Sequence, residues 1–210
     1  MIEKLLDFFY PPMCGMCGKP DKEWICENCF KKLRINIIEK KEYNKFYDKQ
    51  IYLFKYRDIR NLILRYKFNG CSYLNNTFSS IILKNKNLCR KLKFYDIIIP
   101  VPMFDKKKKN RGYNQTELIT NKISKKLDIK TSTKILIKIK NTKTQSTLKE
   151  KQRFKNVQNA FSIKNSNLIK NKNIILFDDI ITTGATINEC SKILKQNGAK
   201  KVIVLALAKD

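Results

Sequence analysis

Two adjacent carboxylates and a threonine-rich loop are the residues of this sequence best suited to chemistry. Residues 174–186 read IILFDDIITTGAT, so an apolar run leads into Asp178 and Asp179 and a Thr/Gly loop follows. Ligands of open α/β sheets bind at the edge where such strands end. Backbone N–H groups and hydroxyls at the start of a helix can bind a phosphate dianion there. The candidate phosphate-binding residues are Thr182, Thr183, Gly184, Ala185 and Thr186.

Two carboxylates repel a polyphosphate, so the acid pair beside such a loop must bind a different part of the ligand or a metal ion. Asp178 and Asp179 can accept hydrogen bonds from the vicinal hydroxyls of a sugar, or they can hold Mg²⁺ directly or through water. The alternative without chemistry is a Thr/Gly-rich turn in which both acids cap the following helix. The pattern favours a sugar-phosphate site over this alternative.

A cluster of cysteines near the start of the sequence predicts a metal site. Four of the seven cysteines follow a C-x2-C-x8-C-x2-C pattern, at Cys14, Cys17, Cys26 and Cys29. Each pair can form a knuckle, and two knuckles complete a tetrahedral zinc site. Four thiolates leave no position for a substrate, so the zinc would be structural. Two disulfides or a redox pair are the alternatives. The scattered cysteines are expected in the core or on helices: Cys71, Cys89 and Cys190.

The elements that must position these residues alternate between strands and helices, which predicts an α/β fold with a parallel sheet. Strands are expected at 51–56, 96–101, 135–139, 173–177 and 202–208. Helical spacing occurs over 60–67, 74–92, 113–127 and 185–197, and a short helix with a linker is expected within 30–47. Residues 105–111 read as a charged loop, 141–150 as a mobile polar segment and 178–184 as a turn.

The amino-acid composition excludes several classes of function. The chain has 210 residues and no histidine, which removes histidine acid–base catalysis and histidine metal ligands. No apolar run is long enough to cross a bilayer. The apolar residues of the segment 1–12 are interrupted by the acidic residues Glu3 and Asp7, and no small-residue cleavage site follows. We therefore expect structure there and not a signal peptide. Disulfides, which need an export route, become less favoured than a metal site.

The formal net charge of +27 suggests an anionic partner such as nucleic acid, a phosphate-rich ligand or a membrane surface. Lysine, asparagine and isoleucine dominate, and AT-rich coding bias could produce part of this excess. The charge is uneven, however. Of the 45 basic and 18 acidic residues, nine and seven lie within positions 1–45, which leaves 36 and 11 for positions 46–210. This asymmetry favours a functional role for the second part.

The motif at 174–186 resembles the signature by which type I phosphoribosyltransferases bind 5-phosphoribosyl 1-diphosphate (PRPP). Two other stretches are DIIIPVP running on to RGYNQTELI, and TQSTLKEKQRFKNVQNAF over residues 144–161. Together with the four-cysteine module, they resemble the ComF family of competence-associated proteins over nearly the whole chain. The resemblance implies a zinc ribbon over residues 1–45 and, over 46–210, a type I phosphoribosyltransferase fold with a parallel sheet, flanking helices and a hood.

The same resemblance implies roles for individual residues. Asp178 and Asp179 would hold the ribose 2- and 3-hydroxyls, and residues 182–186 the 5-phosphate. Pro100, Val101, Pro102 and Met103 would lie near the diphosphate, together with Mg²⁺ and Arg111. Residues 138–153 would form the hood loop. From their residue types alone, Gln145 and Asn156 are uncharged hydrogen-bond donors. The family usually carries an arginine a few residues before Gln145, and Lys138 and Lys140 stand there in this chain.

The leading hypothesis is a cytoplasmic PRPP-binding protein acting in DNA uptake, with transfer of a phosphoribosyl group to an unidentified acceptor. An inner-membrane face location, and a competence helicase or translocation channel as partner, are family-level expectations. The alternative is a single-stranded DNA-binding adaptor that keeps the PRPP pocket. Its DNA contacts would be Lys106, Lys107, Lys108, Lys109 and Arg153. A PRPP-binding transcription regulator is a third hypothesis.

Overall fold

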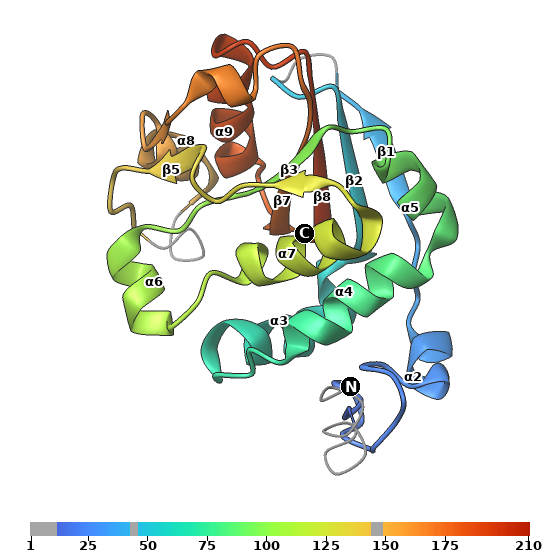
Figure 1. Cartoon of the computed structure of the whole chain (residues 1–210). Coiled ribbons are helices and arrows are strands. Elements are labelled where there is room, and N and C mark those ends of the chain that lie inside the picture. The colour runs from blue at the N-terminus through green and yellow to red at the C-terminus, as the bar shows by residue number, and fades with distance from the viewer. Residues whose placement is uncertain (1–11, 43–45, 144–148) are drawn as a thin grey trace.

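A six-stranded sheet organises the chain (Figure 1). The computed structural model describes residues 12–42, 46–143 and 149–210. The strand order is β1-β2-β8-β7-β3-β4. Only the β1–β2 pair is antiparallel among these described strands, and the other four pairs are parallel. The strand bounds are β1 Ile38–Lys41, β2 Lys49–Lys55, β3 Ile97–Pro100, β4 Lys130–Thr131, β7 Asn173–Ile181 and β8 Lys201–Lys209.

Helices cover both faces of the sheet, which is why its central strands are apolar on both sides. Ile175 and Phe177 of β7 pack into the layer of α3, α4, α5 and α7, whereas Ile174 and Leu176 face α9. A two-stranded antiparallel sheet, β5–β6, belongs to the second layer. The remaining bounds are α3 Tyr56–Phe68, α4 Leu74–Lys84, α5 Lys86–Leu92, α6 Asp105–Arg111, α7 Gln115–Leu127, β5 Leu136–Lys138, α8 Glu150–Val157, β6 Phe161–Ile163, 3₁₀ helix η2 Ser166–Leu168 and α9 Ala185–Gln196.

The four-cysteine segment packs directly on this body (Figure 1). It contains helix α2 Glu27–Lys32, and Cys14, Ile25 and Cys29 belong to the same hydrophobic cluster as α3 and α4. The backbone of Gly15 lies so close to α4 that an added Cβ would stand 2.2 Å from Thr77 Oγ1. The division of domains at residue 45 stays a prediction. Strand β1, which precedes it, pairs with β2.

The α/β fold with a mostly parallel sheet is confirmed, but strand β1 lies within the segment 30–47 that was predicted as a helix and a linker, and three further local predictions were wrong. The lysine-rich run is a helix, α6, because lysine and arginine are good helix formers, Asp105 stands in the first turn, and Gly112 ends the helix at φ 85°. The predicted helix 74–92 is two helices, since Asn85 Oδ1 accepts a hydrogen bond from the Leu88 N–H at 2.8 Å and starts α5.

The third correction concerns the acid pair. Residues 178–181 continue strand β7 and do not start a turn, because Asp178 pairs with Ala206 of β8 and Ile180 with Ala208. Within the described ranges, none of the helices is both apolar enough and long enough to cross a membrane.

Candidate functional site

The two aspartates point to opposite faces of the sheet, since successive side chains of a strand alternate. Asp178 shares its face with Ile174 and Leu176, on the side of α9, and Asp179 shares the other face with Ile175 and Phe177. Both stand near the edge where the parallel strands β2, β3, β7 and β8 end. Asp178 and Asp179 therefore contact different neighbours, although both lie at the same edge of the sheet.

Asp179 is held by a lysine from helix α3. Its Oδ1 accepts a hydrogen bond from Lys67 Nζ at 2.8 Å, and the two side chains are 10% and 21% exposed. A charge with so little exposure needs a partner, and Lys67 supplies one from a position 112 residues earlier in the chain.

Asp178 is a carboxyl group with an unusual proton affinity. Burial raises its pKa from the ordinary 3.8 to about 7, and the neighbouring charge of Asp179 adds to this increase. The positive charges of Lys67 and Lys138 and the Asp179 N–H, which donates to Asp178 Oδ1 at 2.8 Å, oppose the increase. Asp178 can therefore gain or lose a proton near neutral pH.

The threonine-rich loop ends at a helix N-terminus, as the phosphate-binding prediction requires. Gly184 has φ 77°, a left-handed conformation that favours glycine, and α9 begins at the next residue, Ala185. The first four residues of α9 are uncharged. Thr182, Thr183 and Thr186 are partly exposed. The positive end of the α9 dipole consequently meets the same edge as the acid pair.

The segment at 100–102 lies beside the acid-bearing strand. The Val101 N–H donates to the carbonyl oxygen of Phe177 at 2.8 Å. The Val101 carbonyl oxygen accepts from Thr116 Oγ1 at 2.8 Å and from Asn114 Nδ2 at 3.2 Å. Pro100 ends β3, and Pro102 is partly exposed. The fold thus brings the predicted diphosphate segment next to β7.

Basic side chains from three elements share the electrostatic field of the acids. Burial lowers the pKa of Arg111 of α6, and the negative charge of Asp179 opposes that decrease. Burial also lowers the pKa of Lys138 of β5; the charge of Lys107 adds to the decrease, and that of Asp178 opposes it. Lys107 of α6 lies in the electrostatic field of Arg111 and Lys138. Together with Lys67, this gives four cations for two carboxylates, a surplus of positive charge that suits a polyanionic ligand.

The lysine run of α6 divides into two kinds of residue. Lys107 Nζ donates to the Thr142 carbonyl oxygen at 2.7 Å, and Lys108 pairs with Glu117 at 2.7 Å. Lys106 and Lys109 are exposed, and their side chains have no hydrogen bond or ion pair with another described residue. Arg153 lies partly buried on α8. The DNA-contact role of this set stays a prediction.

The hood region is described on both sides of a gap. Gln145 and Leu148 lie outside the described residues. Asn156 of α8 bridges to Lys143: its Nδ2 donates to the Lys143 carbonyl oxygen at 3.0 Å, and its Oδ1 accepts from the Lys143 N–H at 3.1 Å. Lys138 is one of the two lysines in the region where the resemblance implies an arginine. Its Nζ lies 5.3 Å from the ring centroid of Phe161.

The four cysteines converge on one point. Their Sγ atoms all lie within 4.8 Å of one another, so the group could hold a metal ion. Burial acts to raise the pKa of Cys14, but backbone N–H groups of the knuckles outweigh it and lower that pKa to about 6. Burial and the neighbouring thiols raise the pKa of Cys29 to about 12. Four sulfur atoms in this geometry fit a tetrahedral metal, which would bind them as thiolates.

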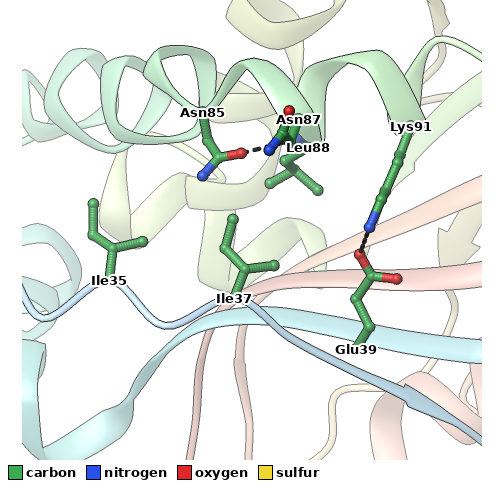
Figure 2. A pocket seen from close by; sticks show the side chains of 7 residues that line it. All are labelled: Ile35, Ile37, Glu39, Asn85, Asn87, Leu88 and Lys91. Carbon is green, nitrogen blue, oxygen red and sulfur yellow. Dashed lines mark hydrogen bonds and ion pairs between the residues drawn. The ribbon is translucent and has the colours of Figure 1, made fainter.

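Two cavities lie at the opposite edge of the sheet. One of about 280 Å³ lies between α5 and the start of β1, where Ile35 and Ile37 face Leu88 and Lys91 bonds to Glu39 (Figure 2). A second, of about 380 Å³, is lined by residues at the starts of β2, β7 and β8. We identify the candidate site at the carboxyl edge by its acid pair, its cations and the loop before α9, and not by a cavity.

Sequence reasoning missed Lys67 and the residues on either side of it. Position 67 read only as the end of a helical pattern, and no local signal connected it to Asp179. Phe68 also lies at the site, with Arg111 5.4 Å from its ring centroid.

A family model described as "Phosphoribosyl transferase domain" matches residues 87–210. The chain therefore contains a phosphoribosyl transferase domain, which implies a PRPP-like ligand. Competence protein F of Haemophilus influenzae is 33% identical over 205 residues, covering 94% of this chain and 85% of that protein. The chain belongs to the ComF family of competence proteins.

"DNA utilization protein YhgH" of Escherichia coli O6:H1 is 29% identical over 151 residues, 70% of this chain and 66% of that protein. A purine phosphoribosyltransferase structure from Pyrococcus horikoshii is 16% identical with a TM-score of 0.41, covering 65% of this chain and 74% of that one.

Proposed function

We propose that this protein binds PRPP at the carboxyl edge of its sheet. The observation that carries the proposal is the convergence of two carboxylates, a phosphate-binding type of loop and four cations at one edge. Residues 182–186 bind the 5-phosphate, and Asp178 and Asp179 accept hydrogen bonds from the ribose hydroxyls. Residues 100–102 and Arg111 lie toward the diphosphate, where the guanidinium suits phosphate oxygens.

Mg²⁺ bound together with the ligand would offset part of the negative charge of the diphosphate. In the transfer reaction, the bond between ribose C1 and the diphosphate oxygen breaks with its electron pair on the leaving pyrophosphate. A lone pair of the acceptor forms the new bond to C1, and the proton that the acceptor loses passes to solvent. The chain's own contribution is electrostatic: Lys107, Arg111 and Lys138 offset the charge of the leaving group. Turnover with a panel of nucleobases tests the transfer step.

The four-cysteine module holds one structural zinc ion. Cys14, Cys17, Cys26 and Cys29 supply four sulfur ligands, and such complete thiolate sites are closed to substrates. Reduced thiols of this kind persist in the cytoplasm, where we place the protein, with the inner face of the membrane as a working location. Metal analysis of the purified chain should give about one zinc.

The process that the protein serves is DNA uptake, a proposal supported by the names of the relatives "Competence protein F" and "DNA utilization protein YhgH". Partners in this process would be a competence helicase or translocation channel. The second candidate function is a single-stranded DNA-binding adaptor that retains the PRPP pocket. Two features favour it: Lys106 and Lys109 are exposed without a side-chain partner in the described part of the chain, and Phe68 is 63% exposed.

PRPP binding measured by calorimetry with and without Mg²⁺ tests the main proposal. The double variant Asp178→Asn/Asp179→Asn should lose PRPP binding and keep its zinc. Wild-type affinity in that variant would refute the site. For the adaptor, replacing Lys106 and Lys109 with glutamine should reduce the slope of log affinity for single-stranded DNA against log salt by about two. An unchanged slope would discard this DNA track.

A further inference from the structure

The last residues of helix α3 supply contacts to the candidate site from outside the matched phosphoribosyl transferase domain. That match begins at residue 87, whereas Tyr66, Lys67 and Phe68 precede it. Tyr66 contacts α7, Lys67 pairs with Asp179, and Phe68 lies under Arg111. The site is therefore completed by a helix end that the domain match does not include.

The position of Lys67 is fixed by the residue before it. The fully buried Tyr66 donates its hydroxyl hydrogen to the Gln115 carbonyl oxygen at 2.9 Å. The Tyr66 carbonyl oxygen accepts a hydrogen bond from the Tyr113 hydroxyl, and the two tyrosine rings stack with centroids 5.8 Å apart. Because both the side-chain hydroxyl and the carbonyl oxygen of Tyr66 are hydrogen-bonded, the backbone from which the Lys67 side chain extends is held in place.

Lys67 bonds the Asp179 carboxylate directly. Alternation along β7 separates Asp179 from Asp178, so the groups around Asp178 on the α9 side do not hold it. The Lys67–Asp179 pair measures 2.8 Å and is little exposed, which makes it a geometric constraint as well as a neutralising charge. The ammonium group bonds one carboxylate oxygen, Oδ1.

We propose that Lys67 is a positioning residue that orients Asp179 to accept hydrogen bonds from the ribose hydroxyls of the ligand. The proposal rests on the proposed PRPP-binding function and extends the site to helix α3. Lys67 acts through the carboxylate and does not contact the diphosphate. Its loss should therefore weaken every ligand that contains the ribose and leave binding of pyrophosphate unchanged.

The test is calorimetric titration of the full, zinc-loaded chain with three probes: PRPP, ribose 5-phosphate and inorganic pyrophosphate, all with Mg²⁺. In Lys67→Met, affinity for PRPP and for ribose 5-phosphate should fall by the same factor, about tenfold or more. Pyrophosphate affinity should stay at the wild-type value. Lys67→Arg, which keeps the charge, should restore most of the affinity for the two ribose ligands.

Lys49→Met is the matched control. It removes a half-buried lysine that pairs with Glu39 at 2.9 Å, at the opposite edge of the sheet, and it should leave all three affinities unchanged. If Lys67→Met does not fold, Lys67→Gln takes its place with the same expected pattern.

Each outcome decides a separate point. Failure of the wild-type chain to bind PRPP and ribose 5-phosphate would refute the proposed function itself. Wild-type affinities in a folded Lys67→Met variant would overturn the role of Lys67 alone. A parallel loss of pyrophosphate affinity would mean direct contact with the diphosphate, which also overturns the positioning role.

Discussion

Asp178 should lower the stability of this protein at neutral and alkaline pH, so Asp178→Asn should be more stable than the wild type there. Burial, with the charge of Asp179, raises the Asp178 pKa from 3.8 to about 7. The native state therefore binds a proton more tightly than the unfolded state does, and the free energy of unfolding falls as pH rises from about 4 to about 7. The difference of about three pH units corresponds to at most about 4 kcal/mol.

Asparagine carries no charge to desolvate, so the gain of Asp178→Asn should depend on pH. Urea unfolding at pH 8 should show a stabilisation of about 2–4 kcal/mol, and at pH 4.5 a gain much smaller than that. Asp105→Asn, at an exposed position in the first turn of α6, is the control and should shift the free energy of unfolding by less than about 0.5 kcal/mol. Equal stabilisation by Asp178→Asn at both pH values would refute the reasoning.

Three further predictions concern the loop and the metal module. Gly184→Ala should lower the free energy of unfolding by about 1–2 kcal/mol, since φ 77° disfavours a side chain; a thermal shift assay with no change in melting temperature would contradict this. Gly15→Ala should lower it by about 1–3 kcal/mol, because its Cβ would lie 2.2 Å from Thr77 Oγ1 and 2.6 Å from Leu74 Cδ2; urea unfolding with a wild-type midpoint would count against this packing. Cys14→Ser should reduce the bound zinc measured by mass spectrometry, and full zinc occupancy would exclude Cys14 as a ligand.

Much of the fold and part of the site could be predicted from local patterns. The apolar runs at 96–101, 173–177 and 202–208 indicated parallel strands because both of their faces must be buried. The four-cysteine spacing indicated one metal centre, and the Sγ atoms do lie within 4.8 Å of one another. The wrong predictions have local reasons: Asn85 starts a new helix within an apolar pattern, and lysines that read as a loop form α6.

The local sequence was enough to predict a phosphate-binding loop beside two acids, because a strand, two acids, a Thr/Gly turn and a helix are consecutive in the chain. The opposite orientation of Asp178 and Asp179 could not be predicted in the same way, since it follows from the continuation of the strand to Ile181 through pairing with β8. The partnership of Lys67 with Asp179 spans 112 positions. Such a contact depends on how helix α3 packs against the sheet, and no periodicity along the chain records that packing.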